Sequence, residues 1–178
     1  MTHESGGRRC AWGGPANVKP PKSSRPIIGW REWVELVDLA VPTIKVKVDT
    51  GARTSVLHAF NMERFEQDGR AMVRFDIHPF QRTTSNTVNV TVPLAGERHI
   101  RNSGGHQELR PVIHTRVALL GKIWVIDVTL TNRDLMGFRM LLGRQAVRGR
   151  FLVDPGRSYL DRAQMNARSK PTRWKKQP

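Results

Sequence analysis

The sequence predicts an all-β fold, because its hydrophobic residues alternate with polar ones and turn residues interrupt them at short intervals. Four segments between residues 44 and 131 show the period of two that is typical of half-buried strands. Glycine, aspartate and asparagine punctuate them, as expected at the turns between strands. Several short strands at this spacing predict an antiparallel sandwich or barrel.

Each alternating segment places its apolar residues on one face and polar residues on the other. A single short helix is expected from about Arg144 to Arg148, with Gly149 as its stop. The apolar positions are Ile44, Val46 and Val48 in the first strand; Val73, Phe75 and Ile77 in the second; Val88, Val90 and Val92 in the third; and Trp124, Ile126, Val128 and Leu130 in the fourth.

The chain has 178 residues, a length that allows one ordinary domain with extensions. Residues 1–26 are rich in glycine, proline and serine with scattered basic charge, and we interpret them as a flexible basic leader. Residues 27–160 contain the strand pattern and form the expected domain. Residues 161–178 are polar and basic, which is typical of a disordered tail.

The formal net charge of +15 favours an acidic partner, such as nucleic acid, an anionic surface or an acidic peptide. Cys10 is the only cysteine, so no internal disulfide can form, which fits a reducing compartment. No secretory signal and no apolar run of membrane-spanning length is present. We therefore expect a soluble cytoplasmic protein.

The strongest chemical signal is the run from Val48 to Ala52, in which Asp49-Thr50-Gly51 follows a predicted strand. Gly51 allows the backbone to turn closely, and Thr50 can hydrogen-bond to fix the loop. An aspartic peptidase holds two such carboxylates a few ångströms apart, where they share a proton: one deprotonates a water while the other protonates the scissile carbonyl. The same triplet also occurs in ordinary turns, so its strand context and a second motif carry the interpretation.

That second motif is the apolar run Met140-Leu141-Leu142 followed by Gly143 and Arg144. Together with the Asp-Thr-Gly-Ala run it resembles the retropepsin pattern. The sequence is also similar to a bacterial family labelled ATP-dependent zinc proteases, over roughly residues 27–160. The stretches that carry this similarity are Ile28 to Val34, Lys47 to Ser55, Arg110 to Ile113, and Leu142 to Arg144 continuing to Asp154-Pro155.

The resemblance implies a small retropepsin-like acid-protease β-barrel with a flap hairpin and one short C-terminal helix. It also implies a homodimer in which each chain supplies one aspartate. Members of the family are often associated with an ATP-grasp ligase that adds glutamates to a ribosomal protein. Independently, no second Asp-Thr-Gly or Asp-Ser-Gly occurs in this sequence, so a complete carboxylate pair requires a second copy of Asp49.

The family label itself is not supported by metal or nucleotide motifs in this sequence. The six histidines form no His-Glu-x-x-His pattern, and no cluster of cysteine and histidine has metal-ligand spacing. No glycine-rich phosphate-binding loop ending in Gly-Lys-Ser/Thr is present. We expect neither zinc nor ATP, and no other cofactor.

Arg53 stands where viral retropepsins carry an acidic residue that pairs with the later arginine, here Arg144. Two roles for Arg144 stay open: a structural one, in which it bonds carbonyls or another carboxylate, which we favour, and contact with substrate. Arg53 is expected to face an acidic substrate side chain, with Thr54 beside it.

The segment from Arg98 to His106 has paired glycines between two strand-like stretches and matches a flap in position. Its candidate substrate contacts are Arg101, Asn102 and His106, with Arg110 just beyond it. The alternative is a solvated hairpin tip, because tips commonly carry charge.

These observations favour an aspartic endopeptidase that acts as a homodimer on acidic peptides and trims poly-glutamate tails from a ribosomal protein. The alternative is a non-catalytic basic module on RNA or the ribosome, whose contact with RNA would be weak, electrostatic and salt-dependent. A metal-dependent hydrolase is a third reading that rests on the family label alone.

Overall fold

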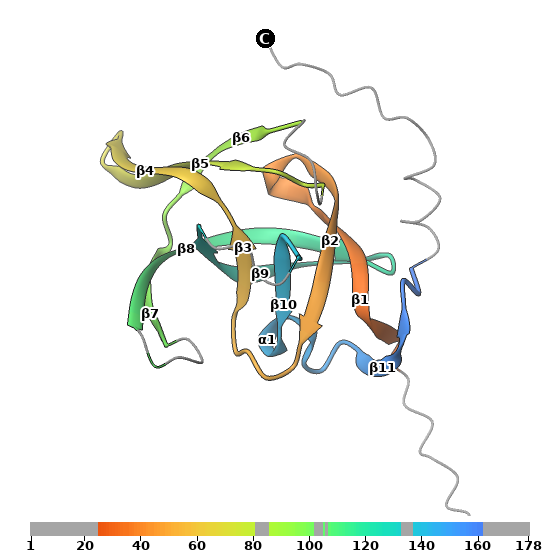
Figure 1. Ribbon diagram of the computed structural model, residues 1–178. Helices are drawn as coiled ribbons and strands as arrows, with labels where there is room; N and C mark the ends of the chain where they lie inside the picture. The colour runs from red at the N-terminus through yellow and green to blue at the C-terminus, as the bar shows by residue number, and fades with distance from the viewer. Residues whose placement is uncertain (1–24, 81–85, 102–104, 106, 133–136, 162–178) are drawn as a thin grey trace, which may run out of the picture.

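A computed structural model describes residues 25–80, 86–101, 105, 107–132 and 137–161 (Figure 1). The expected leader and tail lie outside these residues, apart from Arg25, Pro26 and Asp161. The strands are β1 (Ile27–Leu36), β2 (Val41–Asp49), β3 (Ser55–His58), β4 (Phe60–Gln67), β5 (Arg70–Ile77), β6 (Val88–Pro93), β7 (Gly96–Arg101), β8 (Gln107–Leu119), β9 (Lys122–Thr131), β10 (Met140–Gly143) and β11 (Leu152–Ser158). A 3-10 turn, η1 (Val37–Leu39), and one short helix, α1 (Arg144–Val147), complete the described elements.

Eight strands form one sheet in the order β11-β1-β2-β10-β3-β9-β8-β7. An additional pairing between β1 and β8 brings the sheet back on itself, so that six of its strands enclose a barrel. The all-β prediction is therefore confirmed, and α1 ends before Gly149 as expected.

The expectation of purely antiparallel pairing is wrong for three strand pairs. Strand β11 runs parallel to β1, β10 runs parallel to β2, and β3 runs parallel to β9. The period of two reports which face of a strand is buried, and it carries no information about the direction of the neighbouring strand.

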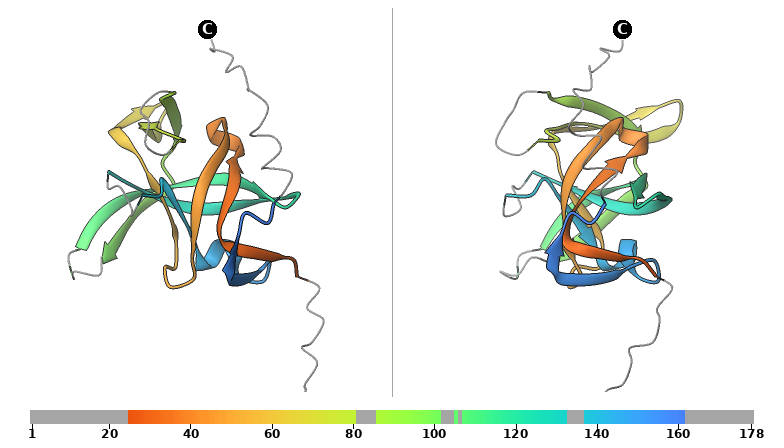
Figure 2. Two further views of the ribbon diagram at one scale, coloured as in Figure 1. Left: turned by 45° about the vertical axis from the view of Figure 1, so that its right-hand side comes forward. Right: turned by 90° about the vertical axis from the view of Figure 1, so that its right-hand side faces the viewer.

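A second sheet of three strands, β4-β5-β6, packs over one end of the barrel (Figures 1 and 2). Val73, Phe75 and Ile77 of β5 are completely buried and belong to the same hydrophobic core as the barrel strands. The two sheets therefore form one folded unit.

The predicted alternation is clearest in β2, which leads to the Asp49-Thr50-Gly51 motif. Ile44, Val46 and Val48 are buried in the core, whereas Lys45 and Lys47 between them are half-buried on the outer face. This alternation fixes the direction in which the last residue of the strand, Asp49, presents its side chain.

The segment that follows β11 is tied to β1 by a buried carboxylate. Glu32 on β1 is fully buried, and its side chain accepts hydrogen bonds from the backbone amides of Gly29 at 2.7 Å and Leu160 at 2.9 Å.

Within the described residues, no helix is long and apolar enough to cross a membrane.

Candidate active site

Asp49 is the last residue of β2, and its carboxylate organises the turn that follows. Its Oδ1 accepts hydrogen bonds from the backbone amides of Gly51 and Ala52, both at 3.0 Å. Aspartate stabilises turns in this way because its short side chain reaches the amides two and three residues ahead. Among the described residues only Oδ1 accepts such bonds, and Oδ2 has no hydrogen bond to the protein there.

Strand β10 and helix α1 hold this loop from the other side. Gly143 lies directly opposite Asp49 in the parallel pairing of β10 with β2. The amide of Arg144 donates to the carbonyl of Ala52 at 2.8 Å, and the amide of Gln145 donates to the carbonyl of Arg53 at 3.1 Å. The second sequence motif thus fixes the loop that follows Asp49.

The guanidinium of Arg144 supports the structural role that we favoured. Its Nη1 donates to the carbonyl oxygen of Thr50 at 3.1 Å, so the side chain bonds the loop after Asp49 through a backbone carbonyl. Thr50 therefore contributes its backbone carbonyl to this contact, and the loop-fixing hydrogen bond expected of Thr50 itself stays a prediction. The acidic partner found in viral retropepsins is replaced by a neutral acceptor.

Gly143 is required by close packing against the segment that follows the loop. Its amide donates to Ser55 Oγ at 3.1 Å in the buried interior. A Cβ added at this position would lie 2.5 Å from the carbonyl oxygen of Thr54 and 2.8 Å from the amide nitrogen of Ser55. Only glycine lets the two backbones approach this closely.

The predicted substrate residues beside the loop differ in accessibility. Arg53 is exposed, as a substrate contact requires. Thr54 is buried, with only 6% of its surface accessible, and its hydroxyl accepts a hydrogen bond from Arg98 Nη1 at 2.9 Å. Direct contact of either residue with substrate stays a prediction.

Strands β7 and β8 form the expected hairpin, in which Arg101 pairs with Gln107 at the last register position. Figure 1 shows these strand ends at the same lower end of the barrel as the loop after β2. Arg101 is exposed there. Asn102 and His106 lie outside the described residues, so their predicted roles are not addressed by the structure.

Arg110 was expected to contact substrate, but the structure places it in the interior. The residue is 5% exposed, and its guanidinium donates from Nε and Nη2 to Glu108 Oε2 at 3.1 and 2.9 Å. A buried arginine needs such a partner, because an unpaired charge would be costly to desolvate. This geometry favours a structural role for Arg110.

Sequence reasoning did not single out Arg98, which lies directly opposite Arg110 in the hairpin. Besides its bond to Thr54, Arg98 donates from Nη2 to Asp127 Oδ2 at 3.2 Å. His114 Nε2 lies 3.3 Å from the other oxygen of Asp127. Arg98 therefore links the hairpin to Thr54, at the end of the loop after Asp49, and to β9, through contacts that no local sequence pattern reveals.

The resolved changes in pKa concern side chains outside the loop after Asp49. Hydrogen bonds from Arg116 hold the pKa of Asp38 below its ordinary value, and the carboxylate raises the pKa of Arg116 in return. Burial, followed by the charge of Arg139, lowers the pKa of His78. Within the described part of the chain, no group of three or more histidine, cysteine or acidic residues could hold a metal ion.

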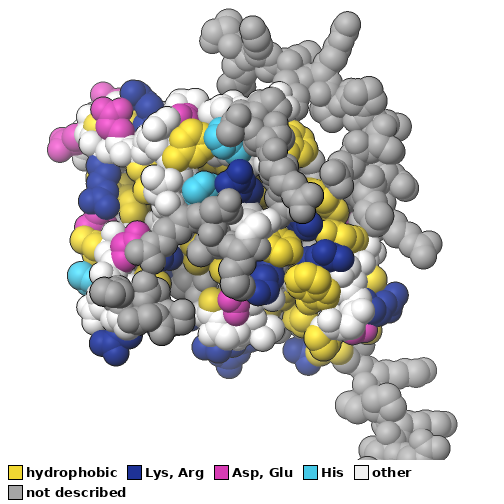
Figure 3. Space-filling view, viewed as in Figure 1, with side chains coloured by type: hydrophobic (Ala, Val, Ile, Leu, Met, Phe, Trp, Pro, Cys, Tyr) yellow, Lys and Arg dark blue, Asp and Glu magenta, His cyan; other side chains and the backbone are white. Residues whose placement is uncertain are grey.

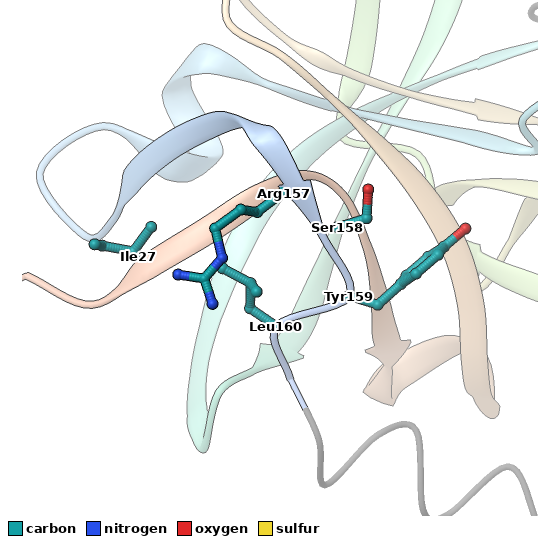
Figure 4. Close-up of a pocket in the computed structure, with 5 residues that line it drawn as sticks. All are labelled: Ile27, Arg157, Ser158, Tyr159 and Leu160. Carbon is teal, nitrogen blue, oxygen red and sulfur yellow. The ribbon is translucent and has the colours of Figure 1, made fainter.

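A shallow hollow of about 550 Å³ lies between the start of β1 and the end of β11, lined by Ile27, Arg157, Ser158, Tyr159 and Leu160 (Figure 4). The guanidinium of Arg157 points into it, whereas the Tyr159 ring points away. None of the predicted site residues lines this hollow. The chemical candidate remains the loop at Asp49, which the β10–α1 segment holds in place.

Comparison with known proteins agrees with this geometry. The family model described as retropepsin-like aspartic endopeptidase RimB matches residues 27–164. The match confirms the retropepsin-like resemblance and extends over both sequence motifs.

Curated relatives carry a different kind of name. A protein of Desulfotalea psychrophila named probable alpha-L-glutamate ligase is 45% identical over 132 residues, which are 74% of this chain and 28% of that protein. A protein of Parasynechococcus marenigrum with the same name is 46% identical over 133 residues, which are 75% of this chain and 28% of that protein. This chain thus spans little more than a quarter of their length.

Among solved structures, a Legionella pneumophila protein of unknown function has a similar fold, with a TM-score of 0.64 and 30% sequence identity. The similarity covers 77% of this chain and 98% of that one. The architecture shared with this chain therefore makes up nearly all of that solved chain.

Proposed function

The chain belongs to the RimB-like family of retropepsin-like aspartic endopeptidases, and from this premise we propose that it hydrolyses peptide bonds as a homodimer. The observation that carries the proposal is a single strand-borne Asp49 whose loop is fixed by β10 and α1. One chain supplies one such carboxylate, and the reaction uses two. Two-fold symmetry is the commonest way in which a soluble protein brings two copies of one residue together.

In the proposed reaction the two Asp49 carboxyl groups share one proton, because two carboxyl groups a few ångströms apart cannot both ionise. The ionised group removes a proton from water while the water oxygen bonds to the scissile carbonyl carbon, and the protonated group donates its proton to the carbonyl oxygen. The resulting diol breaks down when one hydroxyl proton returns to the pair, the C–N bond cleaves and the leaving nitrogen takes a proton from the pair, which again holds one proton. The hydrogen bonds from Gly51 and Ala52 to Oδ1 orient the carboxylate for this step. The loop is held in place during these proton transfers by Gly143, Arg144 and helix α1.

The proposed substrates are glutamate-rich peptides, including α-linked glutamate tails on a ribosomal protein. The formal charge of +15 and the exposed Arg53 beside the loop favour an acidic substrate. The names of the curated relatives concern α-L-glutamate ligation. A peptidase that hydrolyses the bonds which such a ligase forms would give the modification a reverse reaction.

The test is hydrolysis of a peptide with an α-linked oligoglutamate tail by the wild type and by Asp49→Asn. Loss of a catalytic acid or base costs about 10²–10⁴ in rate, so cleavage by the variant should fall by at least that much. Asp76→Asn makes the same chemical change on β5, where the carboxylate bonds Asn61 and Asn89, and should leave cleavage unchanged. Equal cleavage by Asp49→Asn and the wild type would refute the assignment, and so would an active species with the solution mass of a monomer.

A further inference from the structure

A basic side chain, Lys47, lies on the same face of β2 as Asp49. Lys47 and Asp49 are separated by one residue on β2 and are both half-buried, whereas Val46 and Val48 point into the core. Side chains two residues apart on a strand share a face and are separated by roughly 6.6 Å. Lys47 is therefore one strand repeat from the catalytic carboxylate.

The neighbour of Lys47 across the sheet is another cation. Arg31 on β1 lies directly opposite Lys47 in the antiparallel register, and Leu141 on β10 flanks Lys47 on the other side. Among the described residues, neither Lys47 nor Arg31 forms an ion pair with a carboxylate. Like charges in directly opposed positions destabilise a sheet, so this arrangement has a cost within the free chain.

The arginine of the pair is held in place by its surroundings. The Arg31 guanidinium lies 4.6 Å from the ring centroid of Trp30 and 5.0 Å from that of Tyr159, and its Nε donates to Ser158 Oγ at 3.1 Å. Its remaining N–H groups can donate to an incoming acceptor, since a guanidinium has five donors. Cations fixed by aromatic rings need little reorganisation when an anion binds.

The wider surface has the same chemical character. Lys45, the next outward-facing residue of β2, lies over the ring of Phe138 with its Nζ 5.0 Å from the centroid. Figure 3 shows dark-blue basic side chains among yellow hydrophobic ones over this lower right part of the face. An anionic group that reaches Lys47 thus meets a positive and partly apolar surface.

We infer that the Arg31–Lys47 pair is a binding subsite for a side-chain carboxylate of the substrate, close to the bond whose hydrolysis Asp49 catalyses. The inference rests on the proposed function. An extended peptide advances about 3.3 Å per residue, so a glutamate within two residues of the scissile bond can reach the pair. Its carboxylate would neutralise the two opposed cations, which gives acidic peptides an advantage that neutral ones lack.

The first experiment compares cleavage of an oligoglutamate-tailed peptide with that of the same peptide carrying glutamine in the tail. Lys47→Gln should raise KM for the glutamate peptide about 10-fold to 100-fold, the range for a charge-assisted hydrogen bond, and should leave kcat nearly unchanged. The preference for glutamate over glutamine should fall by the same factor. Lys122→Gln, which removes an exposed cation at the start of β9, is the matched control and should behave as the wild type.

The second experiment measures binding of pentaglutamate to Asp49→Asn with and without Lys47→Gln, by calorimetry at low and high salt. The double variant should bind at least 10-fold more weakly at low salt, and salt should weaken its binding less. Cleavage with an unaltered glutamate preference in Lys47→Gln would overturn the subsite and leave the peptidase standing. Binding that depends on Lys47 in a chain that cleaves neither peptide would overturn the peptidase and support the subsite. Absence of pentaglutamate binding by Asp49→Asn would overturn the subsite as well.

Discussion

Replacement of Gly143 by alanine tests whether the second motif acts by holding the catalytic loop. The new Cβ would lie 2.5 Å from the Thr54 carbonyl oxygen, whereas ordinary contact begins at 3.4 Å, so the two backbones must separate by about 0.9 Å. The nearest neighbours of the new methyl group are backbone atoms, which cannot rotate away. Overpacking of this kind costs roughly 1–3 kcal/mol or more of unfolding free energy.

The same displacement should reach the catalytic group, because Gly143 lies opposite Asp49 and bonds Ser55 Oγ. A misplacement of about 1 Å can lower a rate by roughly 10²-fold. We therefore expect Gly143→Ala to lose about 2 kcal/mol in urea unfolding and about 100-fold in kcat on the oligoglutamate-tailed peptide.

Gly156→Ala supplies the matched control for Gly143→Ala. Gly156 lies in β11, and a Cβ there would meet only the flexible side chain of Asp154, at 3.3 Å. This variant should remain close to the wild type in both assays. If Gly143→Ala were as stable and as active as Gly156→Ala, the role of Gly143 in holding the loop would be refuted.

Two further predictions concern carboxylates away from the loop. Glu32→Gln should lower the unfolding free energy by about 2–3 kcal/mol, because its buried side chain would turn an amide group toward the backbone donors of Gly29 and Leu160. Half-buried Glu35→Gln is the control. Equal effects of the two variants in urea unfolding would contradict this reasoning. Arg116 lowers the pKa of Asp38 in the folded chain, so the stability from this pair is present above the unfolded pKa of about 3.9 and is lost as the pH falls through the folded value. Asp38→Asn should accordingly be less stable than the wild type at pH 7, and the difference should shrink in thermal unfolding below about pH 4; a constant difference from pH 7 to pH 2 would exclude this linkage.

The sequence predicted the parts of the fold that depend on local alternation. Buried Ile44, Val46 and Val48 define β2, and the position of Asp49 follows from them. The resemblance also related the Leu-Leu-Gly-Arg motif to the catalytic loop, and the pairing of Gly143 with Asp49 shows the physical basis. Both signals are contained in a few consecutive residues.

The features that sequence reasoning missed depend on which strands become neighbours. The three arginines of this hairpin look alike in the sequence, yet their environments differ. Arg98 bridges Thr54 and Asp127, Arg101 is exposed, and Arg110 is buried against Glu108. The side on which each arginine emerges depends on the register of β7 with β8 and on the strands below them. Likewise, the alternation in β2 predicts that Lys47 faces outward, but only the β1–β2 register places Arg31 opposite it.

Two-fold symmetry has a consequence for specificity if both proposals hold. A dimer that brings two copies of Asp49 to one peptide bond also brings two Arg31–Lys47 pairs, one from each chain, to opposite sides of that bond. Each pair favours a carboxylate, so the preferred substrate should carry glutamate on both the N-terminal and the C-terminal side of the cleaved bond. Mass spectrometry of products from a peptide with one glutamate run between neutral flanks should therefore locate cleavage inside the run. Cleavage mainly at the border between glutamate and neutral residues would show that only one side of the site binds a carboxylate. A symmetric pair of subsites does not permit this result.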